Sequence, residues 1–187
     1  MGLPEGFRTE KTLALENEFK KFEVDLLENL TNEDFRILGM YIQTYNFIDL
    51  NIRRCFNVLN EKGILITSQK ELNIIPNLVN KIISCLSELS LNYEQRKEAE
   101  EKLEEIKFRR NHRNIFAHFA AKRIPNQDAI VFMTNDPIDM KKIFKRISPS
   151  DAIFYAIYDI ADIRGLVKHM LSYENWLAEF TSMIIKI

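Results

Sequence analysis

Residues 35–59 read FRILGMYIQTYNFIDLNIRRCFNVL and carry the most regular hydrophobic pattern in the chain. Apolar and aromatic residues recur at alternating steps of three and four, which places them on one face of an α-helix. Asp49 interrupts this face with a carboxyl group. Thr31 or Asn32 is expected to cap the start of the helix, and Gly63 is expected to end it. The seam consists of Phe35, Leu38, Ile42, Tyr45, Asp49, Ile52, Phe56 and Leu59.

Helical periodicity extends over most of the remaining chain. Residues 64–77 are expected to form a loop in which Pro76 acts as a breaker. Two short apolar runs flank the turn-like TNDPID and indicate strands, AIVFM at 129–133 and MKKIF at 140–144. The other expected helices cover 9–30, 78–91, 93–119 and 148–171, followed by a last helix with Trp176, Phe180, Met183 and Ile187 on one stripe.

These elements predict an all-α fold, an up-and-down bundle of about five to six helices with a small extended or β insertion near residues 128–146. A chain of 187 residues with a net charge of −1 fits a single domain, which we expect to span residues 1–187. No apolar run reaches the length of a membrane span, and the N-terminus lacks a signal-peptide core. We therefore expect a cytoplasmic protein without membrane contact. Cys55 and Cys85 form neither a zinc nor a disulfide pattern.

Residues 107–123 read KFRRNHRNIFAHFAAKR and contain six lysines and arginines but no acidic residue. Because the whole chain is nearly neutral, binding of a polyanion would have to come from such a local excess of positive charge. The segment is equally consistent with a solvated basic face that balances the acidic run before it.

A helical projection separates the polar residues of this segment from its aromatic ones. Arg113, Asn114 and His118 lie on the half of the circumference opposite Ile115, Phe116 and Phe119, and Asn114 and His118 occupy neighbouring turns. An arginine fork matches phosphate oxygens, and an imidazole moves protons near neutral pH. No carboxylate cluster accompanies these residues, which argues against a two-metal nuclease.

A direct way to cut a phosphodiester without a metal uses the substrate's own 2′-hydroxyl as nucleophile, and this chemistry restricts the substrate to RNA. We therefore expect no metal and no cofactor. The other two histidines are interpreted structurally. His112 lies on the Phe-rich side of the helix, where we expect it to be packed. His169 is expected near a helix end, where it would contact the C-terminal dipole.

The run RNIFAH at residues 113–118 resembles the R-x4-H motif of the HEPN superfamily in its RNxxAH form. The early helix, with an aromatic seam from Gly39 to the acid Asp49, is also similar to members of that superfamily. The late strands followed by two helices resemble the same architecture. The resemblance is strong over these two stretches and architectural over the rest.

This resemblance implies a homodimer in which two motif copies form one composite cleft that cuts RNA without a metal and leaves a 2′,3′-cyclic phosphate. Arg113 would stabilise the transition state, His118 would act as general acid or base, and Asn114 would orient one of these groups or the phosphate. HEPN proteins include toxins, antiviral defence effectors and RNA-processing proteins, so an antitoxin or a defence-system partner is also expected. RNA phosphates are expected to contact Arg109, Arg110, Lys122 and Arg123.

Some alternatives stay open in the sequence. Asp49 needs a cationic partner because an unpaired buried carboxylate is costly. Arg53 is one candidate, and Arg110 or Arg113 is the other, which would make Asp49 a supporting acid of the site. Superfamily toxins silenced by nucleotide transfer carry a tyrosine where this chain has Ala120, so that regulation is not expected. The competing functions are a non-catalytic HEPN domain that binds RNA, a nucleotide or a protein, and a plain structural bundle.

Overall fold

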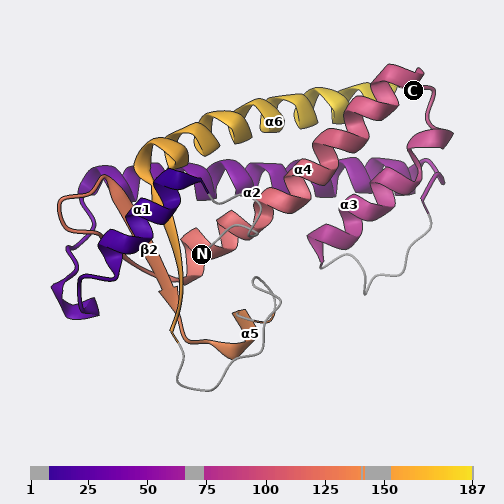
Figure 1. The fold of residues 1–187 in the computed structure, drawn as a ribbon. Coiled ribbons are helices and arrows are strands. Elements are labelled where there is room, and N and C mark those ends of the chain that lie inside the picture. The colour runs from indigo at the N-terminus through magenta and orange to yellow at the C-terminus, as the bar shows by residue number, and fades with distance from the viewer. Residues whose placement is uncertain (1–8, 66–73, 140, 142–152, 187) are drawn as a thin grey trace. The chain divides into compact units, whose positions relative to one another are not determined.

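The computed structural model describes residues 9–65, 74–139, 141 and 153–186. Within these ranges the chain is mostly helical and carries a small three-stranded antiparallel sheet, which confirms the predicted fold class (Figure 1). The α-helices are α1 Glu10–Phe19, α2 Asn32–Glu61, α3 Ile75–Ser84, α4 Tyr93–His118, α5 Pro137–Asp139 and α6 Ile160–Lys186; the strands are β1 Ala120–Arg123, β2 Ala129–Thr134 and β3 Phe154–Asp159; and two 3-10 turns are Val24–Leu26 and Leu86–Glu88.

The chain divides into two compact units. Unit 1 comprises Met1–Ile42 and Asn111–Val167, and unit 2 comprises Gln43–Arg110 and Lys168–Ile187. The three long helices α2, α4 and α6 each contribute residues to both units. The expectation of a single domain over residues 1–187 stays a prediction. Within the described ranges, none of the helices has an apolar stretch of the length that a bilayer requires.

The sheet of unit 1 is packed on both of its faces. β2 is the central strand and pairs antiparallel with β1 and β3. Its odd-numbered residues join a cluster with Leu15 of α1, whereas Phe132 contacts the ring of Phe116 on α4. Because both faces are covered, the strand reads as a continuous apolar run without alternation. This confirms the strand predicted at 129–133, while 140 and 142–144 lie outside the described residues.

Unit 2 is built from the second half of α2, most of α4 and most of α6, together with α3. Tyr45, Ile52, Leu103 and Ile106 are fully buried, and the Tyr45 hydroxyl donates to the backbone carbonyl of Ile106. Both cysteines are buried here. Burial raises the pKa of the Cys55 thiol to about 12 and that of Cys85 to about 11. The two thiols are therefore protonated and unreactive at neutral pH.

Helix α2 begins and ends where the sequence predicts. Thr31 is the N-terminal cap: the Asp34 backbone N–H donates to the Thr31 hydroxyl, and the Asp34 carboxylate accepts from the Thr31 backbone N–H in return. At the other end Gly63 has φ +73° and its N–H donates to the Asn60 carbonyl. A residue with a Cβ is strained at this angle, so glycine suits the position.

The seam of α2 differs from expectation at its first member. Phe35 is 61% exposed, whereas Leu38, Tyr45, Ile52, Phe56 and Leu59 are buried. The hydrophobic periodicity of α2 begins one turn before the first residue that packs in the core. The Phe35 ring, although it continues the apolar face of the helix, is therefore exposed to solvent.

The first predicted helix is too long. α1 ends at Phe19, and Glu28 forms an antiparallel bridge with Arg123 instead of a further helical turn. The predicted helix at 78–91 also has different bounds. It begins three residues earlier, because Pro76 fits the first turn of α3, where no N–H donor is needed, and it ends at Ser84.

The last two predicted helices are also wrong in their bounds. Residues 154–159 form β3 rather than a helix, because they pair along their whole length with β2. α6 then runs without a break from Ile160 to Lys186, because the stretch between Leu171 and Trp176 contains neither Gly nor Pro to stop it. The predicted helix start at 148–151 lies outside the described residues.

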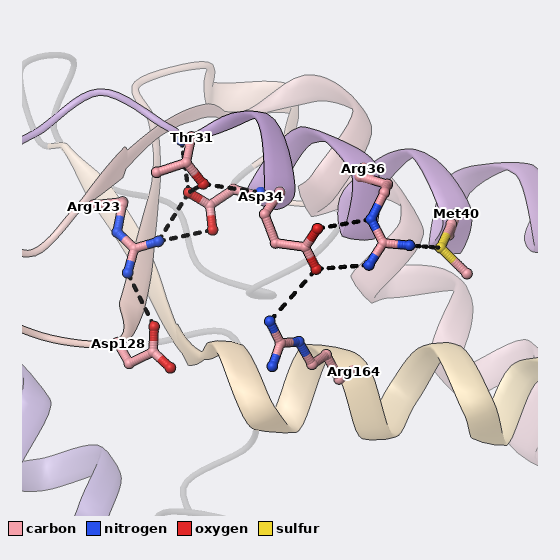
Figure 2. Close-up of polar contacts among 8 residues, drawn as sticks. Thr31, Asp34, Arg36, Met40, Arg123, Asp128 and Arg164 are labelled. Carbon is pink, nitrogen blue, oxygen red and sulfur yellow. Dashed lines mark hydrogen bonds and ion pairs between the residues drawn. The ribbon is translucent and has the colours of Figure 1, made fainter.

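A buried carboxylate joins the start of α2 to β1. Asp34 is 1% exposed, and its oxygens accept hydrogen bonds from the Arg123 guanidinium at 2.9 and 3.0 Å (Figure 2). Burial alone would raise the pKa of the Asp34 carboxyl, but the hydrogen bonds from Thr31 and Arg123 together lower it below its ordinary value. On its other side Arg123 pairs with the exposed Asp128 at 3.0 Å. Through Arg123, this charge network therefore links the start of α2, strand β1 and the residue before β2 within unit 1.

Replacing this charge should destabilise the protein in a pH-dependent way. Asp34→Asn keeps an acceptor oxygen for Thr31 but removes the buried counter-ion of Arg123. We expect the free energy of unfolding to fall by about 1–3 kcal/mol at neutral pH in chemical denaturation. Because the pKa of Asp34 is lowered, the charge contributes above the unfolded-state value of about 3.9 and its contribution is lost as pH falls through the lower folded-state pKa.

The control is Asp128→Asn, since Asp128 is 72% exposed and should contribute less than about 1 kcal/mol. The difference between wild type and Asp34→Asn should persist down to about pH 4 and shrink below it. A difference that stays constant into strong acid would mean that the charge is not its source.

Candidate functional site

An aromatic cluster in unit 1 holds the C-terminal end of α4. The centroid of the Phe116 ring lies 5.0 Å from the ring centroid of Tyr41 on α2. It lies 5.0 Å from that of Phe132 on β2 and 5.1 Å from that of Tyr158 on β3. These contacts fix which side of the last two turns of α4 faces the core. The opposite side of the same turns is accordingly not used in this aromatic packing.

The three predicted catalytic residues lie on that opposite side. His118 is the last residue of α4 and is exposed, while Arg113 and Asn114 are half-buried. The Arg113 guanidinium approaches the Asn114 carboxamide oxygen at 3.5 Å, a distance that a modest rotation would shorten or release. A permanently charged guanidinium, a carboxamide and an imidazole are therefore presented within two helical turns.

The predicted RNA-binding cations do not share one environment. Arg109 pairs with Glu105 at 2.7 Å, and Arg123 is held by two carboxylates as described above. These ion pairs offset the charges of both arginines within the fold. Lys122 differs, because it donates to the neutral carboxamide oxygen of Asn29 at 2.7 Å and this contact leaves its positive charge uncompensated.

The partner of Asp49 is Arg110. The two side chains form an ion pair in unit 2, and they are 18% and 20% exposed respectively. Of the candidates left open by the sequence, the structure shows the pair with Arg110 on the motif helix. The carboxylate thereby offsets a cation that the sequence assigned to RNA contact, so Arg110 is anchored within the fold. A role of Asp49 in supporting the site stays a prediction.

The structural interpretation of His112 is confirmed, and that of His169 is wrong in its cause. His112 is 2% exposed, and one of its ring nitrogens lies 2.8 Å from the Tyr158 hydroxyl. His169 lies within α6 rather than at a helix end, because that helix continues to Lys186. Its contacts are Glu105, at 3.5 Å, and the ring of Tyr173.

A groove in unit 1 was missed by the sequence analysis. It has a volume of about 580 Å³, and the nine described residues that line it are Asn29, Leu30, Phe35, Leu38, Gly39, Ile42, Phe116, Phe119 and Ala121. The first turns of α2 and the end of α4 thus supply most of its surface. The available signal was Gly39, a residue without a side chain on the same helical face as Phe35, Leu38 and Ile42.

The described residues contain no group of three or more His, Cys, Asp or Glu side chains arranged to hold a metal ion. The candidate site consists of the polar stripe of Arg113, Asn114 and His118, together with the groove and Lys122.

The Asp49–Arg110 pair can be measured with a double-mutant cycle. Asp49→Asn, Arg110→Gln and the double variant should give a coupling of about 1 kcal/mol or more in the free energy of unfolding, because both groups are largely shielded from solvent. The matched pair Glu98 and Lys102, which is more exposed, should couple by less than about 0.5 kcal/mol. A larger coupling of Asp49 to Arg53 than to Arg110 would contradict the observed pairing.

Comparisons of the chain with protein-family models, with curated proteins and with solved structures found no match. The site is therefore interpreted from its own residues and geometry.

Proposed function

We propose that this chain is a metal-independent endoribonuclease that cleaves RNA by attack of the substrate's own 2′-hydroxyl group. The observation that carries this proposal is the exposure of His118 on the same side of α4 as the half-buried Arg113 and Asn114. Core packing uses the other side of these turns, where Ile115, Phe116 and Phe119 are buried. The polar stripe is thus accessible to a phosphodiester.

The reaction needs no added reactant. A base removes the proton of the 2′-hydroxyl, the 2′-oxygen forms a bond to phosphorus, and the bond from phosphorus to the 5′-oxygen breaks while an acid protonates the leaving oxygen. The products are a 2′,3′-cyclic phosphate and a 5′-hydroxyl. His118 is suited to the proton transfers, Arg113 to the negative charge that builds on the phosphate oxygens, and Asn114 to orienting the phosphate.

The resemblance to HEPN proteins supports a homodimer with a composite cleft. In such a cleft one neutral imidazole would act as base while a second, protonated imidazole would act as acid. On the accessible stripe of unit 1 the chain presents His118, whereas His112 is buried against Tyr158. A second copy of the chain would supply the second imidazole.

The resemblance to HEPN toxins and defence effectors supports a setting for this activity. We propose that the enzyme acts in the cytoplasm and is restrained by an antitoxin or by another component of a defence system. The alternative is a non-catalytic HEPN domain that binds RNA without cutting it, and the following experiment distinguishes the two.

Removal of the stripe side chains should abolish cleavage without unfolding the protein. Labelled RNA is incubated with each variant in the presence of a chelator, and product formation is followed on a denaturing gel. His118→Ala should reduce the rate by about 100-fold or more, and Arg113→Ala by a comparable factor. Matched controls are His169→Ala and Arg164→Ala, because both residues are exposed and lie off the stripe.

Three results would contradict the proposal. They are full activity of His118→Ala, a strict requirement for a divalent metal, and binding of RNA by the wild-type protein without any cleavage. The last result would favour the non-catalytic binding domain.

Subunit mixing tests the composite cleft. Wild type and His118→Ala are unfolded together, refolded and assayed at constant total concentration. If each active unit needs His118 from both copies, activity should fall as the square of the wild-type fraction, to about one quarter at equal mixing. A linear fall, to about one half, would show that each copy acts alone.

A further inference from the structure

The groove of unit 1 is apolar inside and polar at its rim. Of its nine lining residues, Asn29 alone has a polar side chain. Phe116 and Phe119 are largely buried, so they form its inner wall, while Phe35 presents most of its ring to solvent. A cavity of about 580 Å³ lies within the range of small-ligand sites.

Gly39 keeps one wall of the groove open. A Cβ built at this position would meet no atom within 4 Å. The helical backbone is therefore accessible between Phe35 and Ile42, and a flat ligand can lie against it.

The rim carries a donor and a positive charge. Lys122 donates to the Asn29 carboxamide oxygen at 2.7 Å, which directs the ammonium group to the groove residue. The Asn29 amide also has two N–H donors, which can meet the polar edge of a ligand. These groups match the parts of a nucleotide. An aromatic ring can stack on the face of the base, a carboxamide can hydrogen-bond to its edge, and a lysine can pair with the phosphate.

We propose that this groove binds one unstacked base of single-stranded RNA, with Phe35 against its face, Asn29 at its polar edge and Lys122 at the adjoining phosphate. This inference rests on the proposed ribonuclease function and gives it a substrate class, since paired bases cannot enter. Phe116 lies two residues before His118 and Phe119 one residue after it, so the groove and the imidazole are at the same end of α4, with the groove on the core side of the helix and the imidazole on the other.

A base accounts for the rim better than an apolar segment of a protein does. A protein side chain buried in the groove would use the phenyl rings but would leave the Asn29–Lys122 pair at the edge without a charged counterpart. An RNA strand offers a phosphate next to every base, and stacking on a phenyl ring does not depend on base identity. A protein occupant is therefore an outcome of the test and not the proposal.

The test uses the cleavage-deficient His118→Ala protein, so that binding is measured without turnover. Fluorescence anisotropy gives the affinity for a short, labelled single-stranded RNA. Gly39→Leu in this background fills the groove, and Gly39→Ala is the matched control, because both residues favour helix over glycine and only leucine projects into the space. Gly39→Leu should weaken binding by about tenfold or more, while Gly39→Ala should bind as the parent does.

Phe35→Ala provides a second variant that leaves the core intact, since Phe35 is 61% exposed. Its control is Phe47→Ala, which removes another exposed ring of the same helix outside the groove. Phe35→Ala should weaken binding by about fivefold or more, and Phe47→Ala should not. An RNA in which the bases are replaced by abasic sites should bind the parent and Gly39→Leu equally.

Several results would overturn the proposal. One is equal RNA affinity of Gly39→Leu and Gly39→Ala, and another is the absence of measurable RNA binding by the parent. A third is a change in sedimentation of Gly39→Leu without a change in affinity, which would assign the groove to an interface between copies. If the wild type cleaves RNA but the groove variants bind it normally, the proposed base site is rejected and the ribonuclease function stands. If the groove variants weaken binding as expected but the wild type does not cleave RNA, the ribonuclease function is rejected and the base site stands.

Discussion

The contacts of the Phe116 ring are the constraint on which the account of unit 1 depends. This one side chain meets aromatic rings from α2, β2 and β3. With Phe116 and the hydrogen-bonded His112 directed into the core, the helix geometry leaves Arg113, Asn114 and His118 on the other side. The same packing forms the inner wall of the groove, so the stability of the core and the presentation of the site have a common origin.

Ion pairs within the fold already engage several of the arginines in the basic segment. Asp34 and Asp128 hold Arg123, and Asp49 holds Arg110. These guanidinium groups stabilise the local structure. Removing either member of such a largely shielded ion pair would leave the other charge uncompensated and would destabilise the fold. Lys122 contacts the neutral carboxamide of Asn29, and under the proposed function its positive charge would serve a phosphate. The basic segment therefore combines arginines held in ion pairs with a lysine held by a neutral carboxamide.

Periodicity in the sequence predicted α2, α4 and β2, because their hydrophobic patterns extend over many residues or are bounded by clear turns. β1 and β3 were missed because both depend on pairing with β2, a long-range interaction that leaves little local signal in AAKR. The exposure of Phe35 could not be predicted, because a helical pattern shows which face of a helix is apolar but not how far along the helix other elements cover that face. The motif residues were found through their types and spacing, whereas the groove requires residues from α2, α4 and β1 to meet in space.

In the proposed mechanism, the polar stripe at the end of α4 promotes attack of the RNA's own 2′-hydroxyl group on the adjacent phosphodiester. The most direct measurement compares two RNAs that differ by one oxygen atom. A cut site is first mapped, and the nucleotide on its 5′ side is then replaced by its 2′-deoxy counterpart. We expect cutting at that position to stop while other sites in the same molecule are cut as before. Continued cutting at the deoxy position would mean that water or another group is the nucleophile and would contradict the account.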